Sequence, residues 1–94
     1  MQLDPVVRRN ERAVFRELAS DEGGVLLHLD SGAYHGLNVI GTLIWTLVGD
    51  GSTLGDLVEG VRSKLTETPA GLEADVEAFV EDLVQRDLLT LSKE

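Results

Sequence analysis

The sequence predicts an α+β domain in which a three-stranded antiparallel sheet is followed by three helices. Two observations support this prediction. Short segments with strand-like composition, separated by glycine-containing turns, fill the chain up to residue 38. After that point, apolar residues recur at helical spacing between capping residues and glycines. Because the 94 residues contain no internal repeat or linker, we expect a single domain over residues 1–94.

Three strands are expected before the first helix. Residues 12–18 can form the first strand and residues 25–30 the second. The turn residues 20–24 between them favour a hairpin. A second turn at residues 30–32 leads into residues 33–37, a segment short enough to be an edge strand with a row of unpaired backbone groups.

Two helices are expected next. Asn38 is a good N-cap for the first helix, which should end at the turn formed by residues 49–51. Ser52 or Thr53 caps the second helix, which runs to about Leu65. In both segments the apolar residues form one stripe, so each helix should bury one face.

A third helix and a short tail complete the predicted fold. Thr68 is an N-cap candidate and Pro69 suits the first helical turn, and the helix should end near Asp87. The tail, residues 88–91, is apolar, so we expect it to pack on the core or to add extended structure. Three strands followed by three helices give a winged-helix-like order in which the wing comes first.

Composition argues against several classes of partner. The chain has 17 acidic and 8 basic residues, and its net charge of −9 repels phosphate backbones and anionic lipids. We therefore expect no nucleic acid and no membrane as partners. The lack of cysteine excludes disulfides and thiolate chemistry. With no signal peptide and no apolar run of about 20 residues, we expect a mature, soluble and cytoplasmic protein.

The winged-helix-like order raises DNA binding as an alternative, and the charge of the third helix argues against it. Arg86 is its only basic residue, and the acidic ones are Glu73, Asp75, Glu77, Glu81, Asp82 and Asp87. Half of the basic residues lie instead near the N-terminus, at Arg8, Arg9, Arg12 and Arg16. A solvated strand face is the simpler explanation for these arginines, and contact with a partner protein is the alternative.

Catalytic and metal chemistry have little support. The only histidines, His28 and His35, lie on adjacent predicted strands, and no third metal ligand is suggested. Neither histidine belongs to a nucleophile motif. The segment of residues 49–52 matches no glycine-rich phosphate-binding fingerprint and is more simply a helix connection. We expect no enzymatic activity, no metal and no cofactor.

Five stretches follow one another along the chain: Phe15-Arg16-Glu17, residues 25–38 (VLLHLDSGAYHGLN), residues 41–45 (GTLIW), residues 51–57 (GSTLGDL) and residues 76–89. In this order, they resemble the PqqD family. The resemblance covers nearly the entire chain. The sequence departs from the pattern at Phe15, where many relatives have tryptophan, and one aromatic residue there replaces another.

The resemblance implies a peptide-recognition element. In such a protein the leader segment of a ribosomally synthesised precursor peptide adds as a further strand beside the third strand, in a groove walled by the third helix. Discrete chains of this size resemble the leader-binding subunit of lasso-peptide biosynthesis, an adaptor that works with a separate leader peptidase and a cyclase. The alternative is the PqqD-type peptide chaperone of pyrroloquinoline quinone biosynthesis. A winged-helix DNA-binding regulator is a remote third possibility.

The resemblance also suggests site residues. Backbone groups of the third strand would pair with the leader, at Ala33, Tyr34, His35, Gly36 and Leu37. An apolar wall would come from the third helix, at Val76, Phe79 and Leu83, and core packing is an equal alternative for these three.

Two acidic residues and two aromatic residues complete the predicted site. Asp75 and Asp82 flank the apolar stripe and could meet basic leader residues, although solvation is the simpler explanation. Tyr34 and Trp45 are assigned mainly to packing. An open edge strand would also allow a homodimer.

Overall fold

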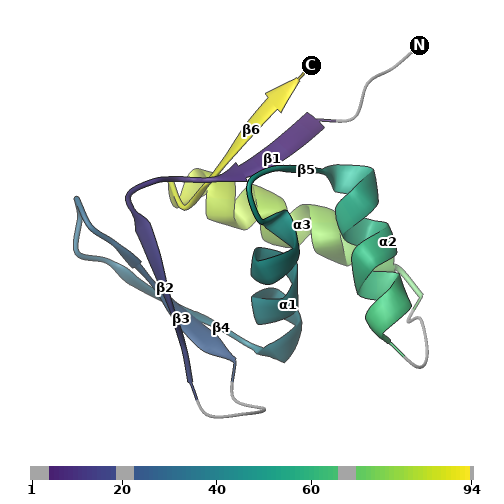
Figure 1. The fold of residues 1–94 in the computed structure, drawn as a ribbon, viewed down its shortest axis with the longest axis horizontal. Coiled ribbons are helices and arrows are strands. Elements are labelled where there is room, and N and C mark those ends of the chain that lie inside the picture. Colours follow the sequence, from purple (N-terminus) through teal and green to yellow (C-terminus); the bar gives the residue numbers. More distant parts are fainter. Residues whose placement is uncertain (1–4, 19–22, 66–69, 94) are drawn as a thin grey trace.

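The computed structural model describes residues 5–18, 23–65 and 70–93. In these ranges the chain forms two three-stranded antiparallel sheets and three helices (Figure 1). The predicted α+β class is therefore confirmed. The sequence predicted only one of the two sheets.

The first sheet, here called the hairpin sheet, is the predicted one. It consists of β2 (Ala13–Glu17), β3 (Gly24–His28) and β4 (Tyr34–Leu37), in the order β2-β3-β4. Part of the predicted first turn, residues 20–22, lies outside the described residues. The N–H of Leu18 donates to the Gly23 carbonyl across 2.9 Å, which closes this end of the hairpin.

Gly23 has a structural role at this turn. Its φ is +82°, and a Cβ built there would lie 2.0 Å from the Leu37 carbonyl oxygen. A larger side chain is therefore excluded by both backbone conformation and space. The turn thus brings the β2–β3 hairpin close to the end of β4.

The second sheet, here called the terminal sheet, combines segments that are far apart in sequence. It consists of β1 (Pro5–Arg9), β5 (Ser52–Thr53) and β6 (Leu89–Lys93), in the order β5-β1-β6. The expectation of extended structure in the tail is confirmed, because residues 89–91 belong to β6. The sequence did not predict β1 or β5, and β1 pairs with β5 and β6, which are both distant from it in sequence.

The three helices are α1 (Val39–Val48), α2 (Leu54–Lys64) and α3 (Leu72–Gln85). Asn38 caps α1 as predicted, with its Oδ1 accepting from the Gly41 N–H at 2.7 Å. Of the two candidate caps of α2, Thr53 is the one used, and its Oγ1 accepts from the Asp56 N–H at 3.1 Å.

The start of α3 differs from the prediction. The predicted cap at Thr68-Pro69 lies outside the described residues, and the helix begins at Leu72 after Gly71. Gly71 has left-handed backbone geometry, with φ of +81°, and makes no side-chain capping bond. Two acidic residues in the first turn, Glu73 and Asp75, interact favourably with the positive end of the helix dipole and so stabilise the start of α3.

The core lies where the helices meet both sheets. Its most buried large side chains include Leu26 of β3, Leu57 of α2, Leu83 of α3 and Leu89 of β6. Figure 1 shows the hairpin sheet at the lower left, the terminal sheet across the top and the helices between and to the right of them. No helix in the described part of the chain is long and apolar enough to cross a membrane.

Trp45 connects α1 to both sheets. Its side chain is buried, as predicted, and its ring lies 6.3 Å from that of Phe15 in β2. The Arg9 guanidinium lies 4.9 Å from the centroid of the Trp45 ring, and Arg9 Nη2 donates to the Trp45 carbonyl at 2.7 Å. Arg9 is exposed, as expected for a solvated strand face, and its guanidinium in addition connects β1 to α1.

Candidate functional site

The open edge of β4 is the first component of the site. In an antiparallel pair, the backbone N–H and C=O groups of successive residues point alternately toward the neighbouring strand and away from it. The N–H of His28 donates to the Ala33 carbonyl at 3.0 Å, and the register then assigns His35 and Leu37 to the same bonded set. The N–H and C=O groups of Tyr34 and Gly36 therefore point away from β3. No strand pairs with this side of β4 in the described residues.

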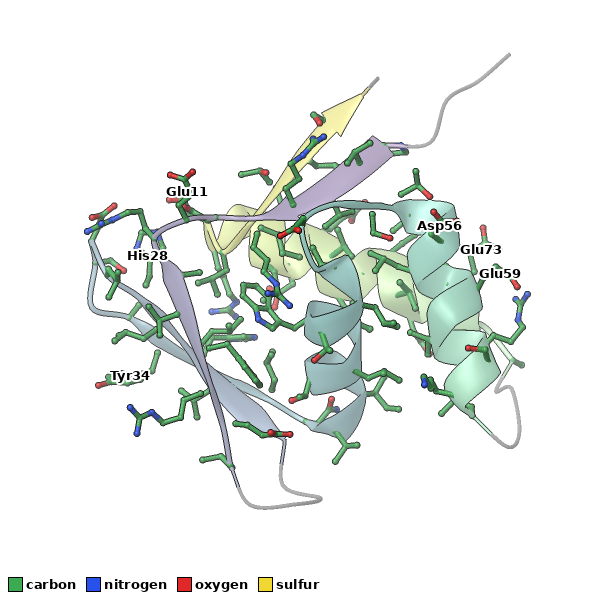
Figure 2. All side chains as sticks on the ribbon, viewed as in Figure 1. Glu11, His28, Tyr34, Asp56, Glu59 and Glu73 are labelled. Carbon is green, nitrogen blue, oxygen red and sulfur yellow. The ribbon has the colours of Figure 1, made fainter. Side chains whose placement is uncertain are left out.

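The alternation divides the five predicted backbone positions into two sets. Ala33, His35 and Leu37 use their backbone groups within the sheet, and Tyr34 and Gly36 present theirs to the outside. Their side chains also alternate: Leu37 is buried in the core and Tyr34 is 74% exposed. The assignment of Tyr34 to packing was therefore wrong. Its ring points away from the helices, as Figure 2 shows.

One face of α3 lies beside this edge. Asp75, Phe79, Asp82 and Arg86 follow each other at spacings of three and four residues, so they share a face of the helix. The two elements approach each other at His35, whose Nε2 lies 3.8 Å from Asp82 Oδ2. The predicted combination of strand edge and third helix is thus present as a spatial arrangement.

The apolar residues predicted for the wall differ in their exposure. Phe79 is half-buried, and it is the one of the three with substantial surface. Val76 is almost fully buried and reaches only the floor of a cavity. Leu83 has no exposed surface, so for Leu83 the structure favours the alternative of core packing.

A large cavity of about 320 Å³ lies beyond the C-terminal end of β4. It is enclosed by the first turn of α1, the residue after α2 and the first half of α3. Its lining is mostly apolar, with Ile40, Gly41, Ile44, Leu65, Leu72, Val76 and Phe79, and polar groups come from Asn38 and Asp75. A concave apolar surface of this size can hold one or two large side chains.

A small cavity of about 190 Å³ lies at the other end of β4. It is lined by residues from the start of β4, from the end of α3 and from the segment after it: His28, Ala33, Tyr34, His35, Arg86 and Leu88. The open edge of β4 therefore runs from one cavity to the other, with Phe79 and Asp82 of α3 alongside.

The two predicted acidic residues have different surroundings. Asp82 accepts from Arg86 Nε at 3.1 and 3.2 Å and faces His35, so its charge is compensated within the protein. Asp75 is exposed and lines the large cavity, and no cation pairs with it in the described residues. A basic ligand group would therefore find an uncompensated carboxylate at Asp75 and not at Asp82.

His28 is fixed by hydrogen bonds within the protein. His28 is buried, its Nδ1 accepts from the Asp30 N–H at 3.2 Å, and its Nε2 lies 2.9 Å from Asp87 Oδ2. We assign the proton to Nε2, because Nδ1 faces a donor. His28 thus links β3 to the α3–β6 connection, where Asp87 has a φ of +62°. The described residues contain no group of three potential metal ligands.

Sequence reasoning missed the contribution of α1. Asn38, Ile40, Gly41 and Ile44 line the large cavity. From the sequence, Asn38 was interpreted as a cap, the two isoleucines as part of the apolar stripe, and Gly41 only as part of a stretch that resembles the PqqD family. Gly41 lets Phe79 approach closely, because a Cβ there would lie 2.9 Å from Phe79 Cε1. Ile40, in the first turn of the helix, is exposed in the structure, and its apolar character alone did not reveal this from the sequence.

Comparison with known structures finds the same fold in two proteins. The first, described as "TbiB1 in Complex with the TbiA(beta) Leader Peptide", has a TM-score of 0.75 and 29% identity, over 87% of this chain and 93% of that one. The second, "Lasso peptide synthetase B1 complexed with the leader peptide", has a TM-score of 0.73 and 26% identity, over 89% and 96%. Both are complexes with leader peptides.

Sequence comparison identifies the family. No curated protein matches the sequence. The family model described as "Coenzyme PQQ synthesis protein D (PqqD)" matches residues 23–89, which contain the second and third strands of the hairpin sheet, all three helices and the start of β6. Since this match spans more than half of the chain and agrees with the fold, the chain belongs to the PqqD family.

Proposed function

We propose that this protein binds the leader segment of a ribosomally synthesised precursor peptide and presents it to separate enzymes in lasso-peptide maturation. The observation that supports this most directly is the open edge of β4 between two cavities, beside α3. The two similar structures are both complexes with leader peptides, and one of them is described as a lasso peptide synthetase. The role is binding without catalysis.

The leader would add as a fourth strand to the hairpin sheet. Tyr34 and Gly36 each offer one donor and one acceptor on the outer side of β4, and each bond made contributes about 1 kcal/mol net. Backbone pairing of this kind is independent of sequence. Selection among peptides would come from side chains that enter the two cavities. Together these contributions are consistent with micromolar to nanomolar affinity, about 8–12 kcal/mol.

Negative charge at the large cavity would add a preference for basic leader residues. Asp75 lines the large cavity without a cationic partner in the described residues, so it would favour a basic leader residue next to an apolar one. Asp82 is compensated by Arg86 and would contribute less. This distinction sharpens the earlier expectation that both carboxylates meet basic residues.

The partners in this proposal are the leader, a separate leader peptidase and a cyclase. A second copy of the protein could also pair through β4, but it would occupy the same backbone groups as the leader. A homodimer of this kind would therefore dissociate when the leader binds. The peptide chaperone of pyrroloquinoline quinone biosynthesis is the second candidate, favoured by the description of the family model. The identity of the precursor distinguishes the two.

DNA binding has less support. The exposed residues of α3 are mainly acidic, and Arg86, the basic residue that follows the helix, is paired with Asp82. A helix with this charge would be repelled by a duplex.

Titration of a fluorescently labelled leader, taken from the precursor encoded beside this protein, tests the proposal by fluorescence polarisation. We expect saturable submicromolar binding that does not require the core segment of the precursor. A scrambled leader of the same composition is the control, since it keeps charge and length. Equal binding of both peptides, or no binding to folded protein, would contradict leader recognition.

A further inference from the structure

Asp87 has an unusual backbone conformation just after α3. Its φ is +62°, and it is the one residue other than glycine with a positive φ in the described parts of the chain. The left-handed position after a helix commonly holds glycine, because a Cβ there crowds the backbone. Aspartate adopts this conformation at a higher energetic cost than glycine. The aspartate at this position therefore indicates a role for its side chain.

The partner of the Asp87 side chain is His28, on β3. Asp87 Oδ2 lies 2.9 Å from His28 Nε2, although the two residues are 59 positions apart in sequence. The Asp87 side chain is 73% exposed and that of His28 only 8%. The His28 ring is also fixed from its other side, because Nδ1 accepts from the Asp30 N–H. A buried ring held at both nitrogens is a rigid anchor for an exposed carboxylate.

The backbone around Asp87 is attached to a different segment, the connection between β1 and β2. Asn10 Nδ2 donates to the Asp87 carbonyl at 2.7 Å, and the Asn10 N–H donates to the Leu88 carbonyl at 3.1 Å. The Asp87 N–H in turn donates to the Val84 carbonyl of α3 at 3.0 Å. Asp87 therefore joins the end of α3 to two segments that are distant from it in sequence.

These contacts lie at the small cavity, which has two sides. One side belongs to the hairpin sheet and the other to the segment after α3; the lining residues are His28, Ala33, Tyr34 and His35 on the first side, and Arg86 and Leu88 on the second. Among the described residues, one hydrogen bond joins the hairpin sheet to residues 86–88, and it is the bond between His28 and Asp87. The nearby approach of His35 to Asp82 is longer, at 3.8 Å. The distance between the two sides of the cavity therefore depends on the bond from His28 to Asp87.

We propose that Asp87, through its bond to His28, positions the small cavity and so determines which leader side chain the cavity accepts. Asp87 is a positioning residue, since it acts through the shape of the cavity. The inference rests on the proposed function, in which the leader pairs with β4 beside this cavity. Backbone pairing would accept any extended peptide, whereas a cavity selects a side chain only if its walls are held in place. Loss of the bond should therefore weaken the cognate leader and spare a leader that lacks the matching side chain.

Two substitutions of Asp87 test the proposal. Asp87→Gly removes the carboxylate and places at this φ the residue that adopts it most easily, so the fold should tolerate the change. Asp87→Asn keeps an oxygen that can accept from His28 Nε2, and asparagine also tolerates the left-handed conformation. Asp30→Asn is the matched control, because it removes an exposed, ion-paired carboxylate that lines neither cavity.

Fluorescence polarisation measures the affinity of each protein for the labelled leader and for leaders in which one residue at a time is alanine. For Asp87→Gly we expect about a tenfold loss with the full leader, and no further loss when alanine replaces the one side chain that enters the small cavity. The two effects should add at every other leader position. Asp87→Asn and Asp30→Asn should bind within about twofold of the wild type.

Wild-type leader affinity in Asp87→Gly would overturn the proposal. A loss that adds with every alanine leader would overturn it too, since Asp87 would then have only a structural role, and so would an equal loss for Asp30→Asn, since the effect would then follow net charge. A second measurement does not depend on the leader: the amide chemical shifts of residues 33–35 should change in Asp87→Gly and stay in place in Asp87→Asn. Unchanged shifts in both variants would overturn the positioning role. Failure of the wild-type protein to bind the leader would instead contradict the proposed function.

Discussion

The two edges of the hairpin sheet have the same backbone chemistry but different surroundings. β2 and β4 each pair with β3 on one side only. On the β2 side, the Leu29 N–H donates to the Arg12 carbonyl and the Leu18 N–H donates to the Gly23 carbonyl. With the strand register, these bonds leave the backbone groups of Ala13, Phe15 and Glu17 pointing away from β3. On β4 the outward residues are Tyr34 and Gly36. An open edge alone therefore does not identify a peptide site.

What distinguishes the edges is what lies beside them. β4 has α3 next to it and a cavity at each end, and neither cavity is lined by a residue of β2. One of the outward groups of β2 is already used, because the Ala13 N–H donates to the Asn10 carbonyl at 3.0 Å. A peptide on β4 could gain side-chain burial as well as backbone bonds. On β2 it could gain only the bonds, about 1 kcal/mol each.

The largest expected effect comes from proline at an outward position of β4. Gly36→Pro removes a donor that faces the proposed leader and places ring carbons in its path. We expect leader affinity to fall about 100-fold, or about 2.7 kcal/mol. Fluorescence polarisation with a labelled leader measures this loss. Gly36→Ala should bind normally, because a Cβ at this position meets no atom within 4 Å.

Glu17→Pro provides the matched control on the other edge. Glu17 also faces outwards, but from β2, so its N–H is not part of the β2–β3 ladder. We expect this variant to keep full leader affinity. If Glu17→Pro weakened binding as much as Gly36→Pro, the leader would add to β2, or both substitutions would act through general unfolding. Thermal unfolding of the two variants separates these explanations.

A charge on the part of α3 that lines the large cavity should have the next largest effect on leader affinity. Phe79→Asp introduces a carboxylate into the mainly apolar wall of the large cavity, so we expect a loss of about 30-fold, or about 2 kcal/mol. Val84→Asp is the comparison, because Val84 is also half-buried on α3 but lines neither cavity. Both should lower the melting temperature. If both also weakened leader binding equally, Phe79 would have only a structural role.

Elements that depend on local sequence could be predicted. Asn38 followed by apolar residues at helical spacing indicates a capped helix, and the structure contains that cap. The strand pairing of the terminal sheet has no local signal. Val7 pairs with Leu91 across nearly the whole chain, so neither strand has a turn or an adjacent partner to indicate it. Only the folded backbone brings these segments together.

The site could be predicted only in part, for the same reason. The edge position of β4 follows from strand order and turn residues, both of which are local. The large cavity, by contrast, depends on how α1 packs against α3. Gly41 and Ile44 occur in a helix pattern that reads as ordinary core, and their place in the cavity wall depends on the contact with Phe79. Tyr34 shows the converse: a large aromatic residue usually indicates packing, but its position on the outer face of an edge strand exposes it.

The smallest expected effect distinguishes the two carboxylates of α3. Asp75→Asn should weaken binding of a leader with a basic residue near the large cavity by about twofold to fivefold, the range of an exposed ion pair. The loss should shrink as salt is raised from 0.05 to about 0.5 M, because screening already weakens the pair. Asp82→Asn should have less effect, since Arg86 already compensates this carboxylate. Equal losses for the two variants, measured by polarisation, would indicate that general negative charge on α3 attracts the leader and that Asp75 makes no specific pair.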